Sequence, residues 1–156
     1  LPIVYNSSGY DSVETLKLLE NVIDIYMPDV KYSNNANAYK YSDIRNYWEI
    51  VKAAVKEMHR QVGDLKVSRR GIAQQGLLIR HLVLPNNQAG SDEILRFIAE
   101  EVCKKTYINI MDQYYPTYKA AKYPEINRRI TNQEFHEVLE KAKEFGLHRG
   151  FEEIFS

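Results

Sequence analysis

Polar and charged side chains follow several short apolar segments of this chain, at or just beyond the point where each segment ends. An Asp, a Lys and an Arg are among them, and together such groups can bind a small ligand. Turn chemistry also favours polar residues after a strand, so each segment alone is a weak signal. The segments that this pattern picks out are Asn6–Gly9, Met27–Lys31, Arg80–Asn87 and Asn109–Tyr114.

Arg80 gives the sharpest signal because it lies inside the apolar run at 77–84. A buried arginine without a partner is very costly, so its guanidinium must face a charged group or a polar cavity. One interpretation is a buried salt bridge, for example with Asp29. The other is a contact with a ligand carboxylate or phosphate. His81 points to the opposite side, and we expect a packed histidine there.

Other familiar chemistry is missing from the sequence. We find no Gly-rich phosphate loop, no nucleophile elbow and no histidine pair at metal-binding spacing. Cys103 is the only cysteine, which excludes an internal disulfide and a centre ligated by several cysteines. We expect Cys103 to be a small packed residue in an apolar helix. His59, His136 and His148 are expected on the surface, so no metal site is predicted.

Short apolar runs alternate with longer amphipathic runs along the whole chain. We predict strands at 1–5, 22–27, 77–84 and 107–111. Helices are predicted at about 11–20, within 32–43, at about 44–62, and from about 91 and 131 onward. The remaining long segments, 64–76 and 112–130, are predicted loops, and 147–156 could add a short final strand.

Capping signals support two of these helices. Asp11 or Ser12 is expected to cap the first helix, with Glu14 completing a capping box from Asp11. Thr131 and Glu134 have the spacing of a second capping box.

The alternation predicts an α/β fold of mainly parallel strands joined by right-handed crossovers, in one domain over 1–156. In such folds ligands bind at the carboxyl ends of the strands. The apolar run at 77–84 is expected in the middle of the sheet, covered on both faces.

The composition is that of an ordinary globular protein. The 156 residues carry 21 basic and 21 acidic side chains, so charge gives no reason to expect nucleic acid or an anionic membrane as a partner. No apolar run is long enough to span a bilayer, and the start has no basic region typical of a signal peptide. The chain does not begin with Met. We expect a reducing, cytoplasmic location.

Five segments, in order, resemble glycyl-radical activating enzymes of the radical S-adenosylmethionine superfamily, and most closely the proteins related to pyruvate formate-lyase activating enzyme. The segments are Val4–Tyr10, Ile25–Lys31, Ile79–Asn87, Asn109–Tyr114 and Tyr123–Ile130. The resemblance covers nearly the whole chain, to about Leu147.

The resemblance implies the C-terminal half of a partial (β/α)6 barrel of TIM type. Intact members reductively cleave S-adenosylmethionine at a [4Fe-4S] cluster and generate a 5′-deoxyadenosyl radical. The CxxxCxxC motif that binds the cluster and the Gly-Gly-Glu segment do not occur in this chain. The cluster is therefore not expected here, and this chain alone is expected to be inactive.

The resemblance also implies which residues bind the cofactor. Asn6 and Ser7 fall near the methionine end of the cofactor, although activating enzymes have an acidic residue where Asn6 stands. Met27 and Asp29 fall at the next strand end, whose groups help to bind a cation and the cofactor. Lys31 falls on a basic position near cofactor and substrate.

Arg80 falls where the family has an arginine in the same cavity. Tyr114 stands where activating enzymes have a histidine, and Gln113 could serve instead. In true activating enzymes the radical abstracts hydrogen from a glycine of a partner protein.

Two surfaces are candidates for partners. The tyrosines and basic residues of the loop at 112–130 could contact a protein substrate or could pack on their own domain. The strand at 1–5 would be an open apolar edge, through which we predict self-association. Two other functions stay open: a self-contained, non-catalytic α/β module that binds a small anionic ligand, and an interaction domain without a ligand.

Overall fold

The structure, a computed structural model, describes residues 1–151 and contains one mainly parallel five-stranded sheet. Strands β1, β2, β4 and β5 are parallel and adjacent in chain order, whereas β3 pairs antiparallel with β4. The strands are β1 Val4–Ser7, β2 Ile25–Pro28, β3 Lys66–Val67, β4 Ala73–Leu82 and β5 Tyr107–Met111. The predicted α/β class with mainly parallel strands is confirmed.

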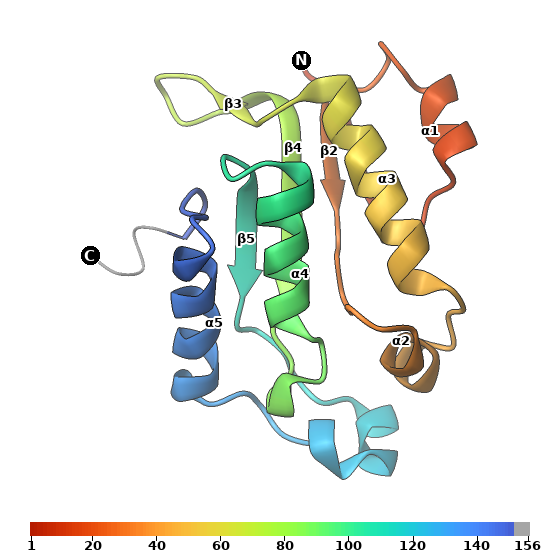
Figure 1. Cartoon of the computed structure of the whole chain (residues 1–156), viewed down its shortest axis with the longest axis vertical. Helices are drawn as coiled ribbons and strands as arrows, with labels where there is room; N and C mark the ends of the chain where they lie inside the picture. Colours follow the sequence, from red (N-terminus) through yellow and green to blue (C-terminus); the bar gives the residue numbers. More distant parts are fainter. Residues whose placement is uncertain (152–156) are drawn as a thin grey trace.

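Helices cover one face of this sheet, and the short helix at 35–42 lies beyond the carboxyl ends of the strands (Figure 1). The helices are α1 Val13–Leu18, α2 Asn35–Ser42, α3 Tyr47–Val62, α4 Ser91–Phe97 and α5 Asn132–Glu144. α1 contacts α3, α3 contacts the turn at 98–102 that follows α4, and α4 contacts α5, so these helices lie side by side in chain order. Right-handed crossovers between strands laid down in one direction place the helices that pack on the sheet on the same side. We call the side without helices the open face.

The core lies between the helices and the sheet. Alternate strand residues such as Tyr26, Leu77 and Ile108 point toward the helices and are fully buried. Val51 and Val55 of α3 pack against them from the helix side. The expectation that the run at 77–84 is covered on both faces is therefore wrong for the described residues, because helices cover it on one face only.

Of the two predicted capping boxes, the one at α5 is confirmed and the one at α1 is wrong. Thr131 and Glu134 form the predicted capping box at the start of α5. Ser12 caps α1 by accepting a hydrogen bond from the backbone N–H of Thr15. Asp11 instead accepts a hydrogen bond from the Tyr5 hydroxyl, so the predicted box between Asp11 and Glu14 is not the cap.

The predicted loop at 64–76 was wrong, because β3 and the start of β4 form an antiparallel hairpin there. Gly71 occupies the turn with a φ of 79°, a conformation that favours glycine. β5 has the predicted limits, and α3 begins three residues later than expected, at Tyr47. Residues 147–151 form no strand, with a turn at 149–151, and the rest of the predicted final strand, 152–156, lies outside the described residues.

The end of the α4 segment also differs from the prediction. A π-helical turn, Ile98–Val102, follows α4, and Cys103 then takes an extended conformation. Cys103 is half-exposed, so the prediction of a packed cysteine inside an apolar helix is wrong. Across residues 1–151, no helix has both the length and the apolar character needed to cross a membrane.

Candidate functional site

The open face carries the charged residues that the sequence picked out. Successive side chains of a strand point to opposite faces, and Leu77, Ile79 and His81 of β4 point toward the helices. Arg80 therefore points to the open face. The same alternation along β2 places Met27 and Asp29 there, because Tyr26 and Val30 are buried in the helix-side core. Asp29 and Arg80 are also partners in the parallel register.

Asp29 and Arg80 form a loose ion pair. Arg80 Nε lies 3.5 Å from Asp29 Oδ1, and the two side chains are 32% and 29% exposed, respectively. That Asp29 oxygen is itself buried, yet no donor in residues 1–151 makes a hydrogen bond with it, since the guanidinium is too poorly aligned to count as one. A ligand cannot reach a buried oxygen, so contact between a ligand and this carboxylate would use the exposed part of the side chain.

Of the two interpretations of Arg80, the structure supplies the salt bridge with Asp29 but does not bury it. A half-exposed pair of this kind contributes about 1 kcal/mol or less to stability. The guanidinium also contacts Met111, with 3.9 Å between Arg80 Nη2 and Met111 Sδ. Part of its donor capacity remains free for a ligand on the open face.

Amide side chains lie on both sides of the pair. Asn6 pairs in register with Met27, and Asn109 of β5 pairs in register with Arg80. Asn109 is exposed and belongs to the same face, because Ile108 and Ile110 point into the core. The residues predicted to bind the cofactor did not include Asn109, although counting alternate residues along β5 would have found it.

Ser7 is the predicted residue that the structure does not bring to this face. It follows Asn6, so its side chain points to the opposite side of the sheet. Its Oγ accepts a hydrogen bond from the backbone N–H of Gly9 and closes the turn after β1. Gly9 is needed in that turn: its φ is 80°, and a Cβ would come within 2.7 Å of the Asp29 carbonyl oxygen. Ser7 thus helps to shape the loop beside Asp29.

Lys31 and Gln113 lie at the same end of the sheet and are exposed. Lys31 follows Asp29 by two residues, and its backbone N–H donates to the hydroxyl of Tyr47, which ties the segment to α3. Gln113 follows β5 by two residues. The predicted residues other than Ser7 therefore gather at the carboxyl ends of β1, β2, β4 and β5, on or beside the open face.

His81 holds the segment behind this face. It is fully buried, with 2.7 Å between its Nδ1 and the Val30 carbonyl oxygen and 2.8 Å between its Nε2 and Ser91 Oγ. Burial lowers the pKa of His81 to about 4, so the ring is neutral at physiological pH. It joins the segment after β2 to the start of α4. The prediction of a packed histidine is confirmed.

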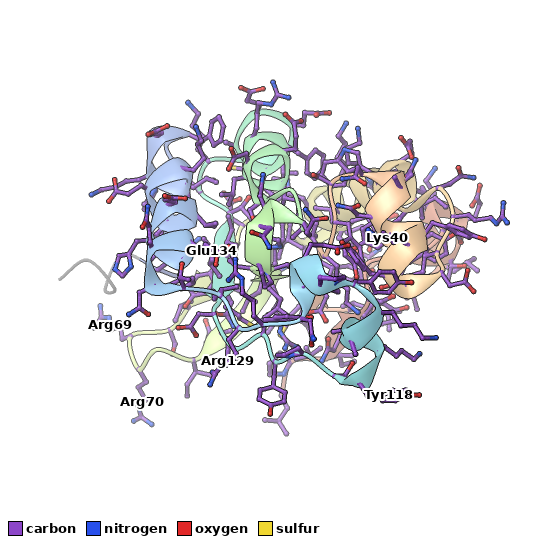
Figure 2. The ribbon with its side chains drawn as sticks, turned by 90° about the horizontal axis from the view of Figure 1, so that it is seen from below. Lys40, Arg69, Arg70, Tyr118, Arg129 and Glu134 are labelled. Carbon is purple, nitrogen blue, oxygen red and sulfur yellow. The ribbon has the colours of Figure 1, made fainter. Side chains whose placement is uncertain are left out.

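The segment at 112–130 crosses the carboxyl ends of the strands, and Figure 2 looks onto this end. Part of the segment packs on its own domain: the Tyr114 hydroxyl donates to the Ile126 carbonyl oxygen, and Tyr123 stacks edge-on against Tyr41. Tyr115 and Tyr118 are 71% and 84% exposed. Tyr114 and Tyr123 thus pack on their own domain, whereas contact of Tyr115 and Tyr118 with a protein substrate stays a prediction.

An ion pair fastens the same segment to α2. Lys40 Nζ lies 2.5 Å from Glu125 Oε1, and the Tyr41 hydroxyl donates to the same carboxylate. The hydrogen bonds from Lys40 and Tyr41 lower the pKa of Glu125 to about 2. Lys40 also lies over the rings of Tyr41 and Tyr123. The segment is therefore anchored on both sides of its exposed tyrosines.

Comparison with known proteins gives a relative that matches most of this chain. No family model matches the sequence. The chain is 36% identical over 148 residues to the uncharacterized protein MJ0674 of Methanocaldococcus jannaschii. The match takes in 94% of this chain but 39% of that protein, so the chain spans well under half the length of its relative.

Proposed function

We propose that this chain forms the later strands of a partial (β/α)6 barrel of the radical S-adenosylmethionine type, and that its open face lines the cofactor cavity. The support is topological. Parallel strands adjacent in chain order, with the helices that pack on the sheet on one side, are the arrangement from which β/α barrels are built. In this proposal the open face is the barrel interior, and further strands add at the free edge of β1.

The residues of the open face fit the methionyl part of S-adenosylmethionine. That group carries a carboxylate and an ammonium, and the face presents a guanidinium beside a carboxylate, both of them partly exposed. In this proposal Arg80 binds the carboxylate of the cofactor and Asp29 accepts from a cationic or hydroxyl donor, with Asn6 and Asn109 beside them. When bound and reduced, the cofactor supplies a 5′-deoxyadenosyl radical.

The cluster does not fit on this chain. It requires three closely spaced cysteines, and the single cysteine, Cys103, precedes β5 at the end of the sheet opposite Asp29 and Arg80. In the proposal the cluster is held by residues outside these 156. The role of this chain is to bind and orient the cofactor and to exclude water from it.

Charge pairing on the open face favours this proposal over a module for a small free anion. The guanidinium of Arg80 already has a carboxylate 3.5 Å away, so a simple anion would compete with Asp29 for the same charge. A ligand that brings both charges satisfies both side chains. The Asp29–Arg80 pair on a helix-free sheet face is the observation that carries the proposal.

The test uses the complete reading frame that contains this chain. After anaerobic reconstitution with iron and sulfide, the protein is reduced with dithionite, S-adenosylmethionine is added, and 5′-deoxyadenosine is measured. We expect 5′-deoxyadenosine from the intact protein and about a tenfold or larger decrease in Arg80→Ala. Arg96→Ala is the matched control, because Arg96 lies on the exposed side of α4.

Two results would overturn the proposal. One is a reconstituted protein whose cluster is visible by electron paramagnetic resonance and which forms no 5′-deoxyadenosine. The other is a complete reading frame without three closely spaced cysteines.

We also propose that the exposed tyrosines of the segment at 112–130 contact a protein substrate. Tyr115 and Tyr118 belong to the segment that crosses the end of the sheet where the cofactor would bind, and Figure 2 shows Tyr118 there. Their exposure of 71% and 84% leaves most of each side chain accessible to a partner. Replacing both by Ala in the complete enzyme should weaken partner binding, as measured by calorimetry, and leave the melting temperature unchanged. Unchanged binding would reject this surface.

A further inference from the structure

Three side chains that commonly bind metals converge at the other end of the sheet. His59 lies in the last turns of α3, Asp64 follows Gly63 after that helix, and Cys103 precedes β5. The distance from His59 Nε2 to Asp64 Oδ1 is 2.9 Å, and that from Cys103 Sγ to Asp64 Oδ2 is 3.5 Å. One ligand atom from each of the three residues lies within 4.8 Å of the others. All three are half-buried.

Hydrogen bonds to the backbone hold the segments of Asp64 and Cys103 in place. Arg149 donates hydrogen bonds to the carbonyl oxygen of Leu65, next to Asp64, and to that of Lys105, two residues after Cys103. It therefore ties together the two segments that carry these side chains. The backbone N–H of Lys105 donates to Cys103 Sγ over 3.4 Å and fixes the position of the sulfur.

Gly76 lets the Asp64 segment approach the sheet. Its φ is 121°, and a Cβ at this position would lie 2.4 Å from the Asp64 carbonyl oxygen. A side chain there would push away the segment that carries the carboxylate. The convergence thus depends on a close backbone contact as well as on side-chain hydrogen bonds.

The three ligand types suit zinc and similar divalent metals. Zn²⁺ takes thiolate, imidazole and carboxylate ligands in tetrahedral geometry, which separates neighbouring ligand atoms by roughly 3.3–3.6 Å. His59 and Cys103 each lie near that distance from one oxygen of the Asp64 carboxylate, at 2.9 Å from Oδ1 and 3.5 Å from Oδ2. With one ligand atom from each residue, all three atoms lie within 4.8 Å, so a small inward shift of the side chains would close them around a metal. Binding would displace the thiol proton and move the imidazole proton to Nδ1, and water could fill the fourth position.

We propose that His59, Asp64 and Cys103 bind one zinc-class divalent cation at the amino ends of the strands. The site is separate from the open-face residues and does not depend on the proposed radical chemistry. The competing interpretation is a hydrogen-bonded trio that closes this end of the sheet without metal, with Asp64 accepting from both of its neighbours.

Cobalt spectroscopy of the 156-residue chain distinguishes the two interpretations. Because Cys103 is the only thiol, a sulfur-to-cobalt charge-transfer band on titration with Co²⁺ reports this site alone. We expect the band together with visible absorption typical of tetrahedral Co²⁺, and we expect Zn²⁺ to abolish both. Absence of the charge-transfer band in the wild-type chain would overturn the proposal without any need for a variant.

Variants then show whether all three residues contribute. Cys103→Ser should remove the charge-transfer band, and His59→Gln and Asp64→Asn should each weaken Co²⁺ binding by about tenfold or more. His136→Gln is the matched control, because His136 is an exposed histidine on α5, and it should leave the affinity unchanged. If His59→Gln and Asp64→Asn both kept the charge-transfer band and bound Co²⁺ with unchanged affinity, the binding would be adventitious binding to the thiol. That result would reject the site.

Loss of folding in a variant would not obscure the result. Circular dichroism of each variant identifies any that is unfolded. Protection of Cys103 in the wild-type chain from a thiol reagent by Zn²⁺ gives a second readout that needs no substitution. Equal rates of modification with and without Zn²⁺ would also contradict the proposal.

Discussion

Acidification should destabilise this protein through His81. The effect should begin at a pH well above the range in which the carboxylates of the protein titrate. The ring is fully buried, and its pKa falls from 6.5 to about 4 because burial disfavours the charged form. The unfolded chain therefore binds a proton that the folded chain does not. The stability that the neutral His81 ring allows is fully present above pH 6.5, the pKa in the unfolded chain. It is lost as pH falls from 6.5 toward the folded-state pKa of about 4.

The magnitude follows from the two pKa values. Linkage gives a loss of about 2 kcal/mol in the free energy of unfolding between pH 7 and pH 5. Glu57 and Glu134 have folded-state pKa values of about 2, so they contribute to the pH dependence only below about pH 4.5. The window from pH 7 to pH 5 therefore isolates the histidine.

Urea unfolding of the chain at pH 7 and pH 5 measures this difference. In His81→Gln the difference in the free energy of unfolding between pH 7 and pH 5 should be much smaller, because the titrating ring is gone. This holds whatever the absolute stability of the variant. His136→Gln should keep the wild-type difference, since His136 is exposed. A wild-type loss below about 0.5 kcal/mol, or the full loss in His81→Gln, would refute the assignment.

Three further outcomes test the fold. Thr131→Ala should cost about 1 kcal/mol in urea unfolding because it removes the capping hydrogen bond of α5, and an unchanged midpoint would contradict this. Gly76→Ala should cost about 3 kcal/mol or more, since its Cβ would meet the Asp64 backbone, whereas Gly71→Ala has open space around it and should cost about 1 kcal/mol. Val4→Lys at the β1 edge should shift the chain toward monomer in sedimentation equilibrium, and a wild-type chain that is already monomeric would count against edge pairing.

Much of the fold was predictable because its signals are local. The strand at 107–111 stands out as an apolar run between polar segments, and Thr131 with Glu134 marks the start of α5 directly. The hairpin at 66–75 was missed because the paired stretches, β3 and the first residues of β4, are polar and short. Their pairing also depends on a partner strand rather than on periodicity. The π-helical turn before Cys103 has no sequence signal that we recognise.

The two candidate sites differed in how far the sequence could reveal them. The open-face residues follow a rule: side chains at the carboxyl ends of parallel strands meet at one edge. Asp29 and Arg80 obey that rule, so they were predicted together. His59 and Cys103 are 44 positions apart and lie on different elements, so only the packing of α3 beside the π-helical turn brings them together.

The open face has a composition that argues for a covering layer. Leu78, Leu82 and Met111 are half-exposed there, around the Asp29–Arg80 pair. Apolar side chains in this number are favoured on a surface that is covered, whereas a partly exposed, loosely made ion pair is favoured where polar ligands enter. A barrel interior meets both conditions, because neighbouring strands enclose the apolar residues and leave the carboxyl ends of the strands accessible. If the complete protein left this face bare, the guanidinium of Arg80 would stay in contact with water. Arg80→Ala would then leave the proposed binding of S-adenosylmethionine unchanged.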